Sequence, residues 1–111
     1  MTRRLTLFLL ALPLLGADIS GKWTFQVDLG GQGGSPRFTF QQKGEELTGT
    51  YSGQLGEAKV KGTVKGDKVE FQFETQGAAV VYAGTIVSAT EMKGRADYAG
   101  QAEGTWTAKK D

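Results

Sequence analysis

Three tyrosines and four glutamines are the side chains of this sequence best suited to bind a ligand. Phenolic hydroxyls and side-chain amides can each donate and accept hydrogen bonds without carrying charge. The tyrosines are Tyr51, Tyr82 and Tyr98, and each glutamine stands beside a glycine in a predicted loop: Gln32, Gln54, Gln76 and Gln101. The set predicts recognition of a polar, uncharged group.

Residues for catalysis are scarce. The chain of 111 residues has no cysteine and no histidine, which excludes Ser–His–Asp triads, cysteine nucleophiles and thiolate metal sites. The carboxylates fall on predicted outward positions or in turns: Asp28, Glu70, Glu74, Glu91 and Glu103. We therefore expect no enzyme activity, no cofactor and no metal. A net charge of +1 also argues against binding nucleic acid through bulk charge.

The elements that would position these residues are short β-strands. From Ile19 onward apolar and polar residues alternate with period two, as in Trp23-Thr-Phe25-Gln-Val27. A five-residue pattern of apolar, any, Gly, usually Thr, apolar recurs, as in Val60-Lys-Gly-Thr-Val64. The predicted strands are 20–29, 36–43, 46–52, 57–65, 68–75, 78–87, 90–98 and 102–109.

Two predicted hairpins fix the register of these strands. A two-residue loop at Gly66-Asp67 places Gly62 opposite Phe71, and one at Gly44-Glu45 places Phe40 opposite Gly49. Both registers put phenylalanine opposite glycine on one apolar face. Eight sequential antiparallel strands with one apolar face predict an all-β, up-and-down β-barrel. A two-sheet β-sandwich is the alternative.

The connections of such a barrel alternate between two rims. One rim carries tight, charged turns, and Trp23 is expected to plug that end. The other rim carries the four glutamines, with the tyrosines near it. One hypothesis is a pocket behind this mouth, walled by Phe38, Phe73 and Trp106. The competing interpretation is a solid core capped by the tyrosines. The loop 30–36 is a flexible lid or a mobile hairpin connection.

Short motifs resemble the calycin superfamily of lipocalins, fatty-acid-binding proteins and avidins. Gly21-Lys22-Trp23 resembles its G-x-W signature, and Leu47-Thr-Gly-Thr-Tyr51 is similar to the third strand of avidin-type proteins. The resemblance implies a ligand-holding barrel in which Tyr51 contacts the ligand. Phe25 stands where avidins have an amide-bearing residue, and their later biotin-boxing tryptophans have no counterpart. The implication is therefore a fold and not biotin.

The first seventeen residues have the pattern of a signal peptide. Met1-Thr-Arg-Arg is basic, 5–15 is apolar apart from Thr6, and Gly16-Ala17 supplies small residues before a cleavage site. The apolar run is about half the ~20 residues that span a bilayer. We expect removal of 1–17 and export of one domain, 18–111, to the periplasm or the medium.

Together these features predict an exported barrel that binds a mainly apolar small molecule with a polar uncharged group, without transforming it. The alternative is a protein-interaction or protease-inhibitor barrel with a filled core. A homo-oligomer is a further expectation, because one strand carries small apolar residues on its outward positions: Ala79, Val81, Ala83 and Val87.

Overall fold

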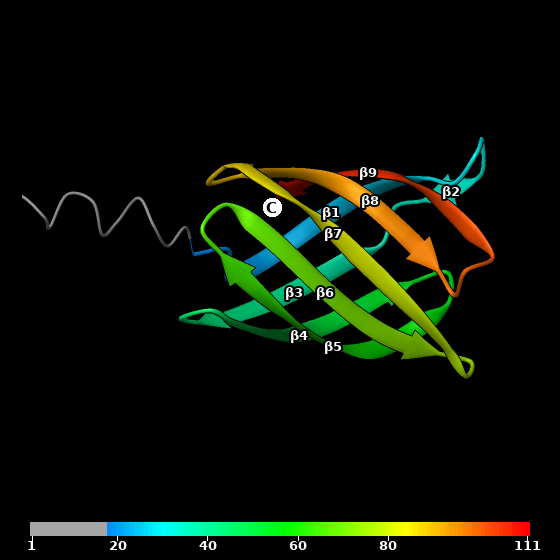
Figure 1. The fold of residues 1–111 in the computed structure, drawn as a ribbon, viewed down its shortest axis with the longest axis horizontal. Coiled ribbons are helices and arrows are strands. Elements are labelled where there is room, and N and C mark those ends of the chain that lie inside the picture. The colour runs from blue at the N-terminus through cyan, green and yellow to red at the C-terminus, as the bar shows by residue number, and fades with distance from the viewer. Residues whose placement is uncertain (1–17) are drawn as a thin grey trace, which may run out of the picture.

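The computed structural model describes residues 18–111, so the predicted signal peptide lies outside the described residues. Strands make up most of this part of the chain (Figure 1). In chain order they are β1 (Gly21–Asp28), β2 (Gly33–Gly34), β3 (Arg37–Lys43), β4 (Glu46–Gly53), β5 (Gly56–Lys65), β6 (Lys68–Thr75), β7 (Ala78–Ser88), β8 (Glu91–Tyr98) and β9 (Ala102–Lys110). The predicted strand bounds agree with these to within two residues, and β2 is an addition.

One closed antiparallel sheet contains all of these strands. Consecutive long strands pair in sequence order, and β1 also pairs with β9 from Trp23 opposite Lys110 to Asp28 opposite Thr105. This last ladder closes eight strands into a barrel, as Figure 1 shows. The two-residue β2 pairs only with the end of β1. The up-and-down barrel is thereby confirmed, and the two-sheet sandwich is excluded.

The predicted register is confirmed at both hairpins. Phe40 lies opposite Gly49 in the β3–β4 ladder, and Gly62 lies opposite Phe71 in the β5–β6 ladder. Burial follows the same alternation, so that β6 buries Val69, Phe71 and Phe73 and exposes the residues between them. A shift by one residue would exchange these two faces, and therefore the apolar pattern specifies the pairing.

The recurring strand glycines allow the backbone and the bulky side chains of other strands to approach closely. A Cβ atom on Gly84 would lie 2.7 Å from Cζ2 of Trp106 and would also overlap the carbonyl oxygen of Lys93. A Cβ atom on Gly62 would lie 2.6 Å from the Cβ of Phe71. Glycine inside a strand is favoured where another group must come this close. The repeat therefore makes room for the aromatic core.

Aromatic rings fill the interior of the barrel. Phe25 packs against several of them, with ring centroids 4.5 Å from Phe38, 4.8 Å from Trp106 and 5.8 Å from Tyr82. Twenty apolar residues of 18–111 are buried, and none of the polar or charged residues in that range is. Burying a side chain of this size contributes about 1.5–3 kcal/mol. The core is thus the main source of stability in a chain without disulfides.

The end of the barrel that carries the tight turns is closed by the first described residues. Ile19 is fully buried there, and its carbonyl oxygen accepts a hydrogen bond of 2.9 Å from the Trp23 indole. The backbone amide of Ile19 donates to Oε1 of Gln42 at 3.0 Å. Trp23 lies at this end as expected, whereas the plugging role of Ile19 was not predicted. Figure 1 places the C-terminus at this same end.

Candidate functional site at the open rim

A hollow of about 900 Å³ lies at the other rim, where β1 ends and β4 turns into β5. Its walls come from the β1–β3 connection, the β4–β5 turn and the last residue of β8. The side chains that line it are mainly apolar or neutral and polar: Val27, Leu29, Gln32, Ser35, Pro36, Tyr51, Gln54, Leu55 and Tyr98. None of the described residues that line it is charged. We call it the mouth hollow.

The glycine-rich connection 29–36 is tied to the barrel by its own hydrogen bonds. The amide of Leu29 donates to the carbonyl of Gln32, and the amide of Gly31 donates to Oδ1 of Asp28 at 2.9 Å. Ser35 Oγ donates to Oε1 of Gln26 at 2.9 Å. Gly33 and Gly34 form β2, which pairs with Val27 and Asp28 at the end of β1. The segment is therefore a structured wall of the mouth hollow.

The β4–β5 turn forms the opposite wall. A Cβ atom on Gly34 would lie 3.3 Å from the Nε2 atom of Gln54, so the Gln54 side chain reaches across to β2. The Tyr51 hydroxyl accepts a long hydrogen bond of 3.4 Å from the amide of Leu55. Thr75 Oγ1 donates to the carbonyl of Leu55 at 2.9 Å. These contacts hold the turn and Tyr51 beside the mouth hollow.

A pair of tyrosines joins the mouth hollow to the core. The hydroxyl oxygens of Tyr82 and Tyr98 lie 2.5 Å apart. Tyr82 is fully buried, whereas Tyr98 is half-buried and lines the mouth hollow. Burial raises the pKa of Tyr82, and its hydrogen bond with Tyr98 raises it further. Burial likewise raises the pKa of Tyr98, so both phenols stay protonated at neutral pH.

The predicted site residues divide between the mouth hollow and other places. Tyr51, Tyr98, Gln32 and Gln54 line it, and Tyr82 lies directly behind Tyr98. The remaining five do not line it: Phe38, Phe73, Trp106, Gln76 and Gln101.

The aromatic residues expected as pocket walls are packed core residues. Phe73 stacks on Tyr51 at 4.3 Å, and the rings of Phe38 and Phe71 lie 5.2 Å apart. Trp106 is 2% exposed, and its indole donates to the carbonyl of Arg95 at 2.8 Å. Of the two interpretations of the interior, the structure agrees with the solid core and not with a pocket behind the mouth, because these inward rings together occupy the space inside the barrel wall. The hollow that exists is shallower and lies between the loops.

Two of the four glutamines lie away from the hollow for a local reason. Gln76 is exposed in the β6–β7 turn, where its backbone adopts the left-handed conformation of the turn with a φ of 56°. Gln101 is exposed in the β8–β9 connection, where its backbone amide donates to the carbonyl of Tyr98 at 2.9 Å. A common rim therefore does not bring all four amides to one point.

Sequence reasoning missed the apolar part of the mouth hollow. Val27, Leu29, Pro36 and Leu55 supply its apolar surface. Leu29 and Leu55 are the apolar residues of two otherwise polar, glycine-rich loops, and that position was the available signal. Both are half-buried and pack against the core.

Another hollow, of about 770 Å³, lies on the outer wall over β7, β8, β9 and the end of β1. Its floor is the backbone of Gly84 and Gly94, and its charged side chains include Lys68, Lys93 and Arg95. It arises because small side chains and glycines leave a depression between longer ones. The tyrosine hydroxyls do not reach it, so the mouth hollow is the better candidate site.

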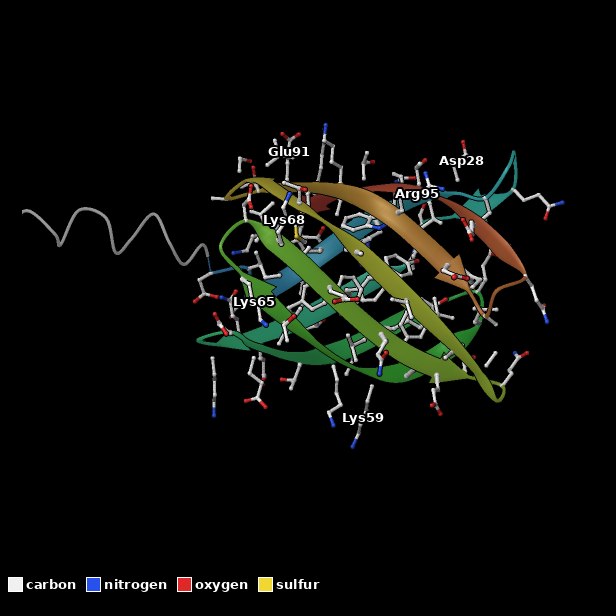
Figure 2. All side chains as sticks on the ribbon, viewed as in Figure 1. Asp28, Lys59, Lys65, Lys68, Glu91 and Arg95 are labelled. Carbon is white, nitrogen blue, oxygen red and sulfur yellow. The ribbon has the colours of Figure 1, made fainter. Side chains whose placement is uncertain are left out.

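The charged side chains of the described residues lie on the outside of the barrel. Figure 2 shows Lys59 and Glu91 projecting from opposite sides of the wall. Within 18–111 one ion pair occurs, between Arg95 and Glu103 at 3.7 Å, and both side chains are well exposed. The same range contains no group of three or more acidic side chains that could hold a metal ion. It also contains no helix that is long and apolar enough to cross a membrane.

The outward residues of β7 form a narrow strip that is apolar except for Thr85. Ala79 and Ala83 are exposed, Val81 is half-buried, and Val87 is 54% exposed at an irregularity between Ile86 and Ser88. Charged neighbours flank the strip, since Glu70 and Arg95 both lie opposite Ala83.

Comparison with known proteins identifies the fold and no family. No family model matches the chain, and no curated protein matches it. A redesigned β-barrel, b11L5F_LGL, is 18% identical with a TM-score of 0.72, covering 84% of this chain and 91% of that chain. Two others were solved bound to the dye DFHBI, each with a TM-score of 0.62 over 84% of this chain and 94% of theirs. They are EF1p2_mFAP2b at 16% identity and the redesigned barrel mFAP1 at 14%.

Proposed function

We propose that this chain is an exported binding barrel that holds a small, mainly apolar molecule with a polar uncharged group, without transforming it. The observation that carries the proposal is the mouth hollow, where Tyr51 and Tyr98 stand among Val27, Leu29 and Leu55. Ligand pockets in proteins typically measure about 300–1,000 Å³ and combine apolar walls with a few fixed polar groups. The mouth hollow has both properties.

Two features of the barrel support binding at the mouth. Two barrels of the same fold were solved with the small dye DFHBI, so the fold accommodates such molecules. The ring-filled interior of this chain provides a rigid floor, because Tyr51 stacks on Phe73 and Tyr98 is held by Tyr82. A floor held in place lowers the entropy lost when a ligand binds.

The second candidate function is protein interaction, and the filled core favours it. A solid barrel offers its surface and loops to a partner, as a protease inhibitor does. Insertion of the first residues into a protease cleft is opposed by the burial of Ile19 and its hydrogen bonds to Trp23 and Gln42. A partner would therefore engage the rim or the outer wall.

Native mass spectrometry of residues 18–111, gently purified from a bacterial host that exports the protein, tests the proposal. We expect a species whose extra mass disappears on denaturation and is lost from a Tyr51→Phe/Tyr98→Phe variant. A Gln101→Ala variant, altered at the same rim outside the hollow, should keep it. A protein that is bare under the gentlest conditions and in the presence of host extract would favour the protein-interaction function.

Export and self-association are further parts of the proposal. The basic, apolar and small-residue order of 1–17 supports cleavage after Ala17 and delivery to the periplasm or the medium. N-terminal sequencing of the protein from each fraction should find Asp18 first.

The apolar strip on β7 supports a homo-oligomer, which a Val87→Lys substitution would weaken. A monomer by light scattering at tens of micromolar would contradict the association.

A further inference from the structure

The direction of one hydrogen bond determines what the mouth hollow can recognise. Within 18–111, the hydroxyl of Tyr82 has Tyr98 as its one hydrogen-bond partner. Tyr82 is fully buried, whereas Tyr98 reaches the mouth hollow. If Tyr98 donated, the hydrogen of Tyr82 would be buried without an acceptor, which is costly. Tyr82 therefore donates, and the hydrogen of Tyr98 remains available to the hollow.

A second hydroxyl is oriented in the same way. Tyr51 accepts the hydrogen bond from the amide of Leu55, so its oxygen is engaged and its own hydrogen is available. Tyr51 and Tyr98 both line the mouth hollow. Burial is the largest cause of the raised pKa values of Tyr82 and Tyr98, so both stay protonated and the Tyr98 donor persists well above neutral pH. The mouth thus presents two phenolic donors beside the apolar side chains of Val27, Leu29 and Leu55.

The lack of charged side chains among the described residues that line the mouth hollow limits which acceptor group a ligand can place there. None of the described residues lining the mouth hollow is a cation. A carboxylate or phosphate placed there would lose hydration without meeting an opposite charge, which is unfavourable. A neutral carbonyl oxygen accepts two hydrogen bonds and carries no net charge. It is the acceptor that suits this site.

We propose that the mouth hollow selects ligands by a neutral carbonyl oxygen, which accepts hydrogen bonds from the hydroxyls of Tyr98 and Tyr51. Tyr82 is a positioning residue, because it holds Tyr98 from behind and fixes which way its hydrogen points. This inference rests on the proposed binding function and deepens it. This inference distinguishes carbonyl compounds from hydrocarbons of the same shape.

Matched probes test the inference. Dissociation constants are measured by equilibrium dialysis for 9-fluorenone, fluorene and 9-fluorenol, and for 1-tetralone and tetralin. We expect each ketone to bind roughly five- to tenfold more tightly than its hydrocarbon, as one or two net hydrogen bonds allow. Tyr98→Phe should lower this ratio in part, because the Tyr51 hydroxyl remains, and Tyr51→Phe/Tyr98→Phe should bring it close to one while hydrocarbon affinity stays within about twofold.

Three further variants complete the test. The Tyr82→Phe/Tyr98→Phe variant leaves neither of these two hydroxyls buried without a partner, so it should fold and show the same reduced preference as Tyr98→Phe. Tyr82→Phe alone should reduce the ketone preference about twofold. Gln101→Ala, at the same rim, should leave it unchanged.

The outcomes separate this inference from the proposed function. Equal binding of ketones and hydrocarbons by the unmodified protein, or tighter binding of the alcohol, would overturn carbonyl selection while leaving the binding function standing. Failure of both ketones and hydrocarbons to bind would overturn the binding function itself, and the inference with it.

Discussion

Tyr82 and Tyr98 form a short hydrogen-bonded pair, with hydroxyl oxygens 2.5 Å apart, that crosses from the closed core to the open rim. They come from the neighbouring strands β7 and β8 and lie two positions apart in that ladder, since Tyr82 is opposite Ala96 and Tyr98 is opposite Val80. One member of the pair is sealed from solvent and the other lines the mouth hollow. The pair therefore couples the stability of the core to the chemistry of the mouth.

The two tyrosines should differ in their effect on stability. Tyr98→Phe leaves the buried Tyr82 hydroxyl without an acceptor and should lower the free energy of unfolding by about 1–3 kcal/mol. Tyr82→Phe frees Tyr98 to bond with water and should cost less. Adding Tyr82→Phe to Tyr98→Phe should restore part of the loss. Urea denaturation of the parent protein, the two single variants and the double variant measures this cycle. If the two single variants lost the same free energy of unfolding and the double variant lost their sum, the assignment of Tyr82 as the donor would be contradicted.

Alkaline pH should destabilise the barrel through the same pair. The pKa of Tyr82 and that of Tyr98 are raised above the ordinary value of 10.0, mainly by burial. The unfolded chain then loses these protons at a lower pH than the folded protein, so their contribution to stability is complete below pH 10 and falls progressively above it. Urea denaturation between pH 8 and 11 should show a shallower decline for the Tyr82→Phe/Tyr98→Phe variant. Identical declines would contradict the prediction.

The inner face of β7 should not tolerate a side chain at Gly84. An alanine there would press its Cβ atom against the Trp106 indole and the Lys93 carbonyl. Overpacking of this kind costs about 1–3 kcal/mol or more. Thermal unfolding should give Gly84→Ala a melting temperature well below that of the parent protein. Thr85→Ala, on the outward side of the same strand, is the control. A Gly84→Ala protein as stable as the control would show that the repeat glycines are not needed for packing.

Ile19 should contribute more to stability than its place near the end of the described chain suggests. Ile19→Ala removes a fully buried side chain and should cost about 2–4 kcal/mol. Ser20→Ala loses the acceptor for the amide of Gln42 and provides a milder comparison. Chemical denaturation tests both variants. An unchanged midpoint for Ile19→Ala would mean that the barrel end is closed without it.

Deleting residues 18–20 removes the Ile19 plug as well. Such a truncation lowers stability whichever function the protein has. It therefore does not distinguish an inhibitor from a ligand-binding barrel, and the mouth variants are needed for that purpose.

The sequence was most informative where turn chemistry and alternation act together. The two-residue loops at 44–45 and 66–67 fix the pairs Phe40–Gly49 and Gly62–Phe71, because any slip would turn apolar faces outward. Pairing between β1 and β9 was predicted because it leaves no exposed sheet edge, and the structure contains this ladder.

Features that depend on side-chain volume or on loop conformation were harder to predict. Alternation shows that Phe38, Phe73 and Trp106 point inward, but it does not show whether the rings leave space between them. The short β2 consists of two glycines that pair with Val27 and Asp28 of β1, and glycines carry no side-chain pattern from which a strand could be predicted. The mouth hollow was therefore foreseen in its tyrosines and in Gln32 and Gln54, but not in Leu29 and Leu55.

The most direct test of the central claim is to locate a bound probe by two-dimensional amide NMR of the protein comprising residues 18–111, titrated with 1-tetralone. Binding at the mouth predicts saturable shifts for Gly31, Gln54, Leu55 and Tyr98, with Thr85, Lys93 and Thr107 on the outer wall unchanged. The Tyr51→Phe/Tyr98→Phe variant should weaken these shifts. Shifts centred on the outer wall, or none that saturate, would contradict the assignment of the mouth hollow as the binding site.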